Sequence, residues 1–376
     1  MDHDIISGDS HVNPDPRFWS EYLPERLRDR APRIESDSEG DYIVFEDTRR
    51  PFTLLGALAG TDVEDYKLHG KLSDTRPGGW DPAARLEDQD IDGVQAEVLY
   101  GGGPLATRDP ELRLASFRAY NDWLADFCSA SPRRLLGIGY VPTDDVDRAI
   151  EEVRHIARRG LSGMLIPPFP PDPDAEEGNV VGGSEMILTG SRDRSYAEER
   201  FDPLWRAVLD EGMAVHMHLG ARPTRTHEAH FLPDMVMSKL TMAEPLALFI
   251  FGGLLERYPQ LKLVSVESGI GWMPFVVHYM DHLWHKHRHW TGNRLPEPPS
   301  VYFRRQILGT FLDDPVGVRE RAEIGVENIL WSSDYPHGET TWPNSHASIE
   351  RHFEGVPEED RYKITYENAA RLYHLI

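Results

Sequence analysis

Short apolar runs alternate along the chain with stretches in which apolar residues recur at helical spacing. A parallel strand that is buried on both faces has such a run, and the alternation of strands with helices predicts a parallel sheet. Eight such units predict closure into a (β/α)8 barrel, the TIM barrel. The predicted strands cover residues 5–12, 93–100, 134–142, 161–168, 213–220, 261–268, 306–312 and a last run that starts at residue 329.

The clearest predicted helix covers residues 144–160. Acidic residues occupy its first turn, apolar residues at helical spacing fill one face, and Gly160 ends it. A doubly wound open sheet is the competing architecture for such a chain. Against it, no G-x-G-x-x-G follows the first strand, and no G-x-x-x-x-G-K-S/T occurs anywhere in the sequence.

Two polar, glycine- and proline-rich stretches interrupt the alternation. We interpret residues 31–79 and 169–195 as insertions after the first and fourth strands, so residues 1–376 form one distorted α/β barrel domain. Within the first insertion, residues 41–47 alternate like a small edge strand. The second insertion is either a lid over the barrel mouth or a disordered or subunit-contacting loop.

The acidic composition narrows the choice of partners. With 40 basic and 63 acidic residues the formal net charge is -23, which repels nucleic acid and anionic membranes. No window of 18 uninterrupted apolar residues and no basic, apolar leader is present, so we expect a cytoplasmic protein. We expect a small-molecule substrate and a homo-oligomer, and we interpret the single cysteine, Cys128, as a buried thiol.

Polar residues that can bind metal follow four of the predicted strands. Side chains two apart on a strand point to the same face, so Asp9 with His11, and His216 with His218, are paired. Carboxylates at the ends of apolar strands are costly unless they are paired, and a cation offsets that cost. We therefore predict that these two pairs, with Glu267 and Asp334, form a metal site at the carboxyl ends of the strands.

The type of metal and the full set of ligands stay open at this point. A set of oxygen and imidazole ligands without thiolate suits Zn, Mn or Fe, and three carboxylates favour Mn or Fe. Two ions are possible if Glu267 bridges them, and a helix after the sixth strand offers His278 and His282, four residues apart. His216 and His218 are both candidate ligands; the alternative is that one of the two is a core histidine, hydrogen-bonded in the layer below.

The chain resembles the amidohydrolase superfamily, in the branch related to aminocarboxymuconate-semialdehyde decarboxylase. The resemblance runs from DSHV near the amino terminus to ENAARLY near the carboxyl terminus, and its most specific pieces are GDSHVNP, HLG, VESGIGWMP and WSSDYPH. It implies the same distorted barrel, with metal ligands at Asp9, His11, His218 and Asp334.

One departure from the family's pattern shapes the functional hypotheses. Many members have a catalytic histidine at the end of the sixth strand, where this chain has Glu267. In this respect the chain is similar to a small set of amidohydrolase-related dinuclear oxygenases, in which Glu267 would be a ligand and His282 or His216 would hold a second ion.

Two functions follow as hypotheses. The leading one is a dinuclear non-haem iron monooxygenase that hydroxylates a small organic substrate in secondary metabolism. The alternative is a mononuclear Zn or Mn decarboxylase or hydrolase, in which Asp334 is a base as well as a ligand and His337 is a supporting or acid group. Glu267, Asp334 and His337 are the predicted catalytic residues.

Overall fold

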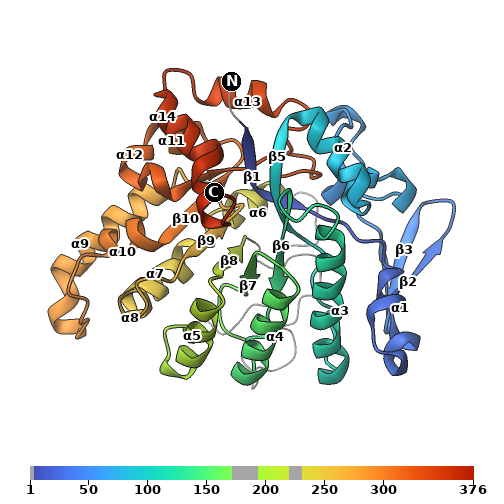
Figure 1. The fold of residues 1–376 in the computed structure, drawn as a ribbon, viewed down its shortest axis with the longest axis horizontal. Helices are drawn as coiled ribbons and strands as arrows, with labels where there is room; N and C mark the ends of the chain where they lie inside the picture. The colour runs from blue at the N-terminus through green and yellow to red at the C-terminus, as the bar shows by residue number, and fades with distance from the viewer. Residues whose placement is uncertain (1–3, 172–193, 220–230) are drawn as a thin grey trace.

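The computed structural model describes residues 4–171, 194–219 and 231–376. Within them, eight parallel strands pair in chain order and form a nearly closed barrel that is surrounded by helices (Figure 1). The TIM-barrel prediction is confirmed. The barrel strands are β1 (Ile5–His11), β5 (Val94–Tyr100), β6 (Leu135–Tyr140), β7 (Gly163–Leu165), β8 (Ala214–His218), β9 (Leu263–Val266), β10 (Ile307–Phe311) and β11 (Ile329–Trp331).

The two edge strands, β1 and β11, are joined at their carboxyl ends. The backbone N–H of Asp334 donates to the carbonyl oxygen of Asp9 at 3.0 Å, and the N–H of His11 donates to the carbonyl oxygen of Tyr335 at 2.6 Å. A hydroxyl adds a third link, because Ser7 Oγ accepts from the N–H of Ser333 at 2.9 Å. These bonds place the segment after β11 directly beside the end of β1.

Helices follow most barrel strands and pack on the outside of the barrel. The predicted helix at 144–160 is α4, which Asp145 caps through a hydrogen bond to the N–H of Arg148. The α-helices are α1 (Phe18–Tyr22), α2 (Pro82–Asp92), α3 (Pro110–Cys128), α4 (Val146–Arg158), α5 (Asp202–Asp210), α6 (Phe231–Ser238), α7 (Ala243–Phe251), α8 (Leu254–Arg257), α9 (Met273–Thr291), α10 (Pro299–Gln306), α11 (Pro315–Arg319), α12 (Arg321–Ile324), α13 (Ser345–His352), α14 (Glu358–Tyr362) and α15 (Asn368–Leu372).

The first insertion carries a small antiparallel sheet of β2 (Arg33–Ser36), β3 (Asp41–Phe45) and β4 (Thr48–Pro51). The short strand that the alternation at 41–47 predicted is β3. Beyond β4 the chain returns to the barrel mouth, where Asn13 Nδ2 donates to the carbonyl oxygen of Gly56 at 2.5 Å. Most of the second predicted insertion, 169–195, lies outside the described residues.

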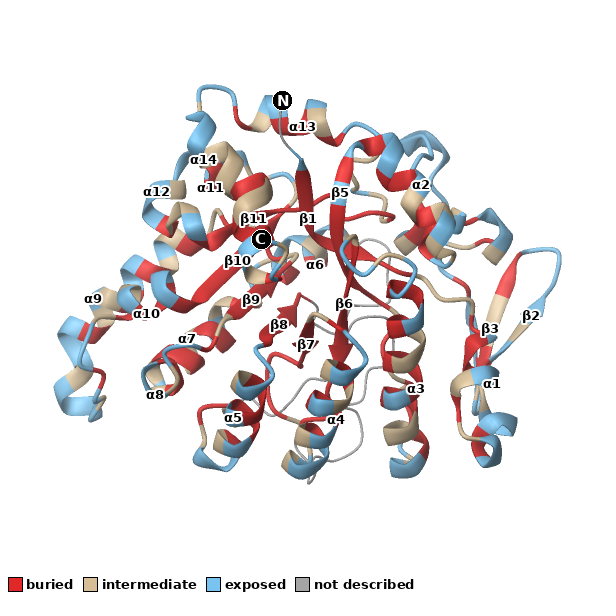
Figure 2. Cartoon of the chain, viewed as in Figure 1, coloured by how far each residue is buried: buried red, intermediate tan, exposed pale blue. Residues whose placement is uncertain are grey.

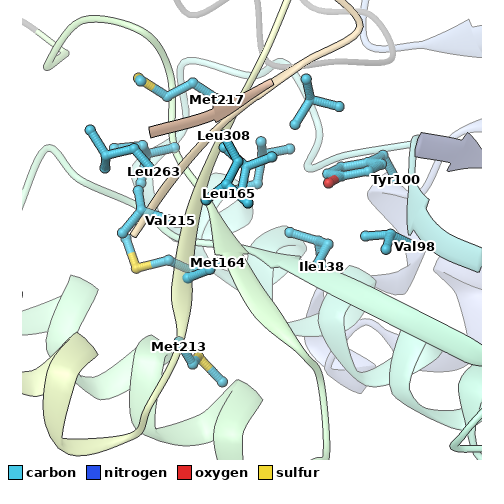
Figure 3. Packing of buried hydrophobic residues seen from close by; sticks show 14 of the residues in the cluster. Val98, Tyr100, Ile138, Met164, Leu165, Met213, Val215, Met217, Leu263 and Leu308 are labelled. Carbon is cyan, nitrogen blue, oxygen red and sulfur yellow. The ribbon is translucent and has the colours of Figure 1, made fainter. Parts of the chain in front are cut away.

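The barrel strands are buried along nearly their whole length, as Figure 2 shows in red, and the outer faces of the helices are exposed. Apolar side chains from β5 to β10 meet in the interior, among them Tyr100, Ile138, Met164, Val215 and Leu263 (Figure 3). This packing is the main stabilising contribution to the fold, and it fixes the strand ends in space. Across the described ranges, no helix has the length and apolar character needed to cross a membrane.

Candidate metal centre

Six of the predicted site residues meet at the carboxyl ends of the strands. They form two overlapping groups, and within each group one ligand atom per residue lies within 4.8 Å of all the others. The two groups have His11 and Glu267 in common. The first group is Asp9, His11, His218 and Glu267, and the second is His11, Glu267, Asp334 and His337.

The imidazoles of His11 and His218 face the carboxylates across the barrel. His11 Nε2 lies 3.4 Å from Asp9 Oδ1, 3.7 Å from Glu267 Oε2 and 3.1 Å from Asp334 Oδ1. His218 Nε2 lies 3.2 Å from Glu267 Oε2 and 3.7 Å from Asp9 Oδ1. Atoms bound to one ion at about 2.0–2.2 Å are separated by such distances, so these nitrogens and oxygens can surround a single cation.

Asp9 gives the clearest sign that a cation belongs here. Its side chain is fully buried, and neither carboxylate oxygen accepts a hydrogen bond from the described residues. Asp334 is equally buried on the other side of His11. Burying carboxylates without hydrogen-bond donors is expensive, and a divalent ion compensates that cost. The donor set therefore fits a metal.

Two of the carboxylate residues have strained backbones. Glu267 has φ of +55° and Asp334 has φ of +56°, in the left-handed region that residues other than glycine rarely occupy. Such strain costs about 1–3 kcal/mol and persists where surrounding structure enforces it, which occurs most often at functional sites. The Thr310 hydroxyl accepts from the N–H of Glu267 at 2.7 Å and helps to hold this conformation.

A backbone contact sets the orientation of His218. Its Nδ1 lies 3.1 Å from the carbonyl oxygen of Leu219 and is therefore the protonated nitrogen. Nε2 then carries the lone pair and faces Glu267. Metal-binding histidines are commonly oriented in this way through their second nitrogen.

His337 stands beside the first group at the barrel mouth. Its Nδ1 lies 3.1 Å from Asp334 Oδ1, and its ring stacks on that of His11 with centroids 3.7 Å apart. Its side chain remains 17% exposed, so it can exchange protons with solvent. Gly56 from the first insertion lies against the ring, since a Cβ added at Gly56 would be 3.5 Å from His337 Nε2. The insertion thus forms one wall of the site.

The charge states of Asp334 and His11 suit metal binding. Burial opposes ionisation of Asp334, but His337 and His11 outweigh it and hold the pKa of its carboxyl well below the usual range. Burial, with a smaller contribution from His337, lowers the pKa of His11 in spite of the carboxylates around it. Asp334 is therefore ionised and His11 neutral at pH 7, which are the forms that bind metal.

Lys239, just beyond α6, is a site residue that the sequence did not reveal. Its Nζ lies 3.3 Å from Glu267 Oε1 and 3.9 Å from Glu339 Oε2. Burial disfavours its charge, yet Glu267, Glu339 and Asp334 raise its pKa above the ordinary lysine value. Lys239 is 28 residues from Glu267 and follows no strand, so no local pattern marks it.

His216 belongs to the layer below the site, which corrects its prediction as a ligand. Its side chain points into the barrel as that of His218 does, but two residues nearer the middle of β8. There its Nδ1 lies 2.7 Å from the Tyr100 hydroxyl, and it joins neither ligand group. Burial, with a smaller contribution from His218, lowers the pKa of His216 to about 3. Of the two histidines on this strand, His216 is thus the hydrogen-bonded core histidine.

This burial predicts a pH dependence of stability. Because the pKa of His216 falls from 6.5 when unfolded to about 3 when folded, its contribution to stability is complete above pH 6.5 and disappears as the pH falls toward 3. His216→Gln should therefore reduce the slope of the free energy of unfolding between these pH values by up to about 1.4 kcal/mol per pH unit. Denaturant unfolding at a series of pH values measures this slope. His289→Gln is the control, because His289 is exposed. Equal slopes in wild type and His216→Gln would contradict the assignment.

His282 does not reach the metal centre, and this prediction is corrected. It lies on the exposed face of α9, where its ring stacks on that of Tyr279 with centroids 6.1 Å apart. His278, four residues earlier, is exposed as well. The two histidines share one face of the helix, as their spacing predicts, but this face of α9 points to solvent.

The chain belongs to the amidohydrolase family. The family model, described as amidohydrolase, matches residues 9–375, so the predicted superfamily is confirmed over nearly the whole chain. The relatives agree with the predicted branch. The gamma-resorcylate decarboxylase of Rhizobium sp. (strain MTP-10005) is 27% identical over 90% of this chain and 99% of its own length. The 2-amino-3-carboxymuconate-6-semialdehyde decarboxylase of Dictyostelium discoideum is 24% identical over 68% of this chain and 67% of its own length.

Solved structures share the fold. An amidohydrolase from Mycobacterium avium subsp. paratuberculosis superimposes with a TM-score of 0.75 at 22% identity, covering 99% of this chain and 98% of the other. A dihydroxybenzoic acid decarboxylase from Polaromonas sp., solved with bound manganese and the inhibitor 2-nitroresorcinol, has a TM-score of 0.63 at 18% identity, covering 99% and 97%. Both likenesses concern the barrel as a whole.

These relatives change the order of the two functional hypotheses. The leading prediction of a dinuclear iron monooxygenase finds no support among them, and neither does iron as the metal. The alternative, a metal-dependent decarboxylase, is the one they favour. The structure agrees with this change. His216 and His282, the residues expected to hold a second ion, both lie outside the ligand groups.

Proposed function

We propose that this protein is a metal-dependent, non-oxidative decarboxylase of small aromatic carboxylic acids. The observation that carries the proposal is the buried group of Asp9, His11, His218 and Glu267, with the Asp334–His337 pair against it at the open end of the barrel. The decarboxylase relatives named above support this reaction class.

One divalent ion, which we propose to be manganese, would be held by Asp9, His11, His218 and Glu267. Asp334, which lies beside His11, would be a further ligand. Nitrogen and carboxylate ligands without thiolate suit manganese or zinc. When bound, the ion supplies an electrostatic anchor for the substrate's carboxylate and stabilises negative charge that develops next to it.

The protein's own part in the reaction is the delivery of a proton. Decarboxylation adds a proton to the ring carbon that carries the carboxylate, and the carbon–carbon bond then breaks. Its electron pair returns to the ring, and carbon dioxide leaves. We assign the proton to His337, whose Nδ1 faces Asp334 and whose ring is open to solvent for reprotonation. Asp334 stabilises the protonated imidazole, and its own low pKa prevents it from taking the proton.

Lys239 completes the charge balance. Asp9, Glu267 and Asp334 contribute three negative charges, which a divalent ion alone does not cancel. The ammonium group 3.3 Å from Glu267 supplies the remaining positive charge, so an anionic substrate can enter a site that would otherwise repel it. We assign Lys239 to positioning Glu267 and attracting the substrate carboxylate.

The reaction class can be tested with 2,6-dihydroxybenzoate as probe. We expect Mn2+-loaded protein to release carbon dioxide from it or from a related hydroxybenzoate at equal rates in air and under nitrogen. Removal of the metal with a chelator should abolish the release, and Mn2+ should restore it. Carbon dioxide release and oxygen uptake are measured in the same samples. Turnover that requires dioxygen, or no release from any hydroxybenzoate tested, would refute the proposal.

The role of Lys239 is tested by separating binding from turnover. Loss of one charge-assisted contact to the substrate should raise KM about tenfold in Lys239→Met, with a smaller change in kcat. Lys239→Arg should recover part of the loss, because it keeps the charge. The matched control is Lys262→Met, since Lys262 lies just before β9 at the other end of the barrel, where it donates to the carbonyl oxygen of Arg305. An unchanged KM in Lys239→Met would remove this assignment.

A further inference from the structure

A pocket lies at the opposite end of α9 from the metal centre. It has a volume of about 960 Å³ and is lined by residues of α7, α8, the last turns of α9 and the segment that follows. Figure 1 shows where these helices lie beside the barrel. Helix α9 begins six residues after Glu267 and has 19 residues, so at 1.5 Å per residue it extends about 28 Å. The volume falls in the range of small-molecule sites. None of its lining residues belongs to the metal centre.

Two indoles give this pocket flat apolar walls. Trp284 is 8% exposed and fixed, because its Nε1 donates to the carbonyl oxygen of Leu295 at 3.3 Å. Trp290 is 75% exposed, and its Nε1 donates to His287 Nδ1 at 2.8 Å. Trp284 is nearly buried, so the accessible ring is that of Trp290, whose N–H group is occupied and whose ring surface remains open to a ligand. Flat rings stack favourably on such faces.

Arg288 supplies a positive charge beside these walls. Its guanidinium carbon lies 4.0 Å from the centroid of the Trp284 ring, which holds the planar group against the indole. The side chain is partly exposed in the pocket lining, and none of its N–H groups donates a hydrogen bond within the described part of the chain. Arg257 in the same pocket differs, since its Nη2 donates to the carbonyl oxygen of Ala197 at 2.7 Å and pairs with Asp202. The accessible N–H groups of Arg288 are therefore available to a ligand.

The remaining charges of the pocket limit what this donor can bind. Glu199, Glu256 and Arg294 also line it, and all three are exposed. With Arg257 paired to Asp202, the charges left are two carboxylates and two guanidinium groups. Because these balance, the pocket suits a ligand with one negative charge better than one with several, such as a nucleotide. A planar carboxylate matches the guanidinium in geometry and accepts two parallel hydrogen bonds from it.

We propose that this pocket binds a planar aromatic monocarboxylate, with its ring against the exposed indole of Trp290 and its carboxylate on Arg288. The proposal concerns a second site and does not depend on the reaction assigned to the metal centre. A ligand bound there would contact α7, α8 and the carboxyl-terminal end of α9, away from the reacting substrate.

The test uses Mn2+-loaded full-length protein, with 1-naphthoate as probe and 1-naphthalenemethanol as its neutral counterpart. We expect saturable calorimetric binding of 1-naphthoate that Arg288→Met weakens about tenfold and Trp290→Ala also weakens. The neutral probe should bind wild type and Arg288→Met alike. Lys286→Met is the matched control, because Lys286 is on the same helix, is exposed and does not line the pocket. Binding of the probe at the metal centre should be unchanged in Arg288→Met. Only the binding that is lost in this variant is therefore assigned to the pocket.

Three outcomes would overturn the proposal. The first is no saturable binding at millimolar 1-naphthoate beyond the component that Arg288→Met retains. The second is an equal loss in Lys286→Met, which would mean that the overall charge of α9 and not the pocket attracts the probe. The third is that the wild-type protein self-associates, and that Arg288→Met and Trp290→Ala abolish this self-association without changing the binding of 1-naphthoate. This surface would then be a contact between subunits.

Discussion

Asp334→Asn should abolish turnover and weaken Mn2+ binding by more than about a hundredfold while the protein remains folded. Even changes in residues outside the ligand shell cost 10–100-fold in metal affinity, and Asp334 lies in direct contact with His11 Nε2 at 3.1 Å. Asparagine keeps the shape of the side chain but loses the charge that attracts the ion and that stabilises protonated His337. Metal analysis after dialysis and a carbon dioxide release assay measure the two effects.

The control for this variant is Asp313→Asn. Asp313 lies near the same end of the barrel but is 75% exposed and pairs with His352. An exposed pair of this kind contributes little, so metal content and turnover should match those of the wild type. If Asp334→Asn keeps its full complement of metal, Asp334 is not part of the site.

Arg85→Met should lower the free energy of unfolding by about 3–5 kcal/mol, because it leaves an uncompensated charge in the protein interior. Arg85 is fully buried in α2, and its Nε donates to Glu97 Oε2 at 2.5 Å. Its Nη1 also donates to the carbonyl oxygen of His11 at 2.7 Å, so the same variant should weaken Mn2+ binding. Denaturant unfolding and metal titration measure the two losses.

Two further variants separate charge burial from loss of packing. Adding Glu97→Gln to Arg85→Met removes the stranded carboxylate and should recover part of the stability. Arg26→Met breaks a comparable pair, with Glu111 at 2.5 Å, but both of these side chains are more than half exposed. Its loss should therefore cost less than about 1 kcal/mol. Similar losses in Arg85→Met and Arg26→Met would contradict the importance of the buried pair.

Helix α2 shows why this network could not be predicted. Its buried residues are Arg85, Asp88, Gln89 and Asp92, which recur at helical spacing. In a sequence, a polar face at that spacing indicates contact with solvent. In the structure it is turned inward, where Tyr335 donates to Asp88, and the Ser345 hydroxyl donates to Asp92 Oδ2 at 2.5 Å. The loop after β11 is held through these contacts between residues about 250 positions apart.

The α9 histidines illustrate the opposite error. Their spacing correctly predicts that His278 and His282 share one face of a helix. Which face a helix buries depends on its packing against the barrel, and α9 buries Met273, Val277, Met280 and Trp284 instead. The spacing thus identified which residues share a face of the helix, but not whether that face is buried or exposed.

The sequence by itself determined the strand order and the barrel, and it included the six residues at the barrel mouth among the eight site residues that it predicted, because these predictions rest on short-range signals. Apolar runs define the strands, two-residue spacing pairs Asp9 with His11, and parallel strands in a barrel must bring their carboxyl ends together. The tertiary structure alone decided that His216 lies one layer below His218, that Lys239 reaches Glu267 and that Arg85 supports His11. Those contacts depend on depth in the barrel and on side chains far apart in the chain, and neither is encoded in local spacing.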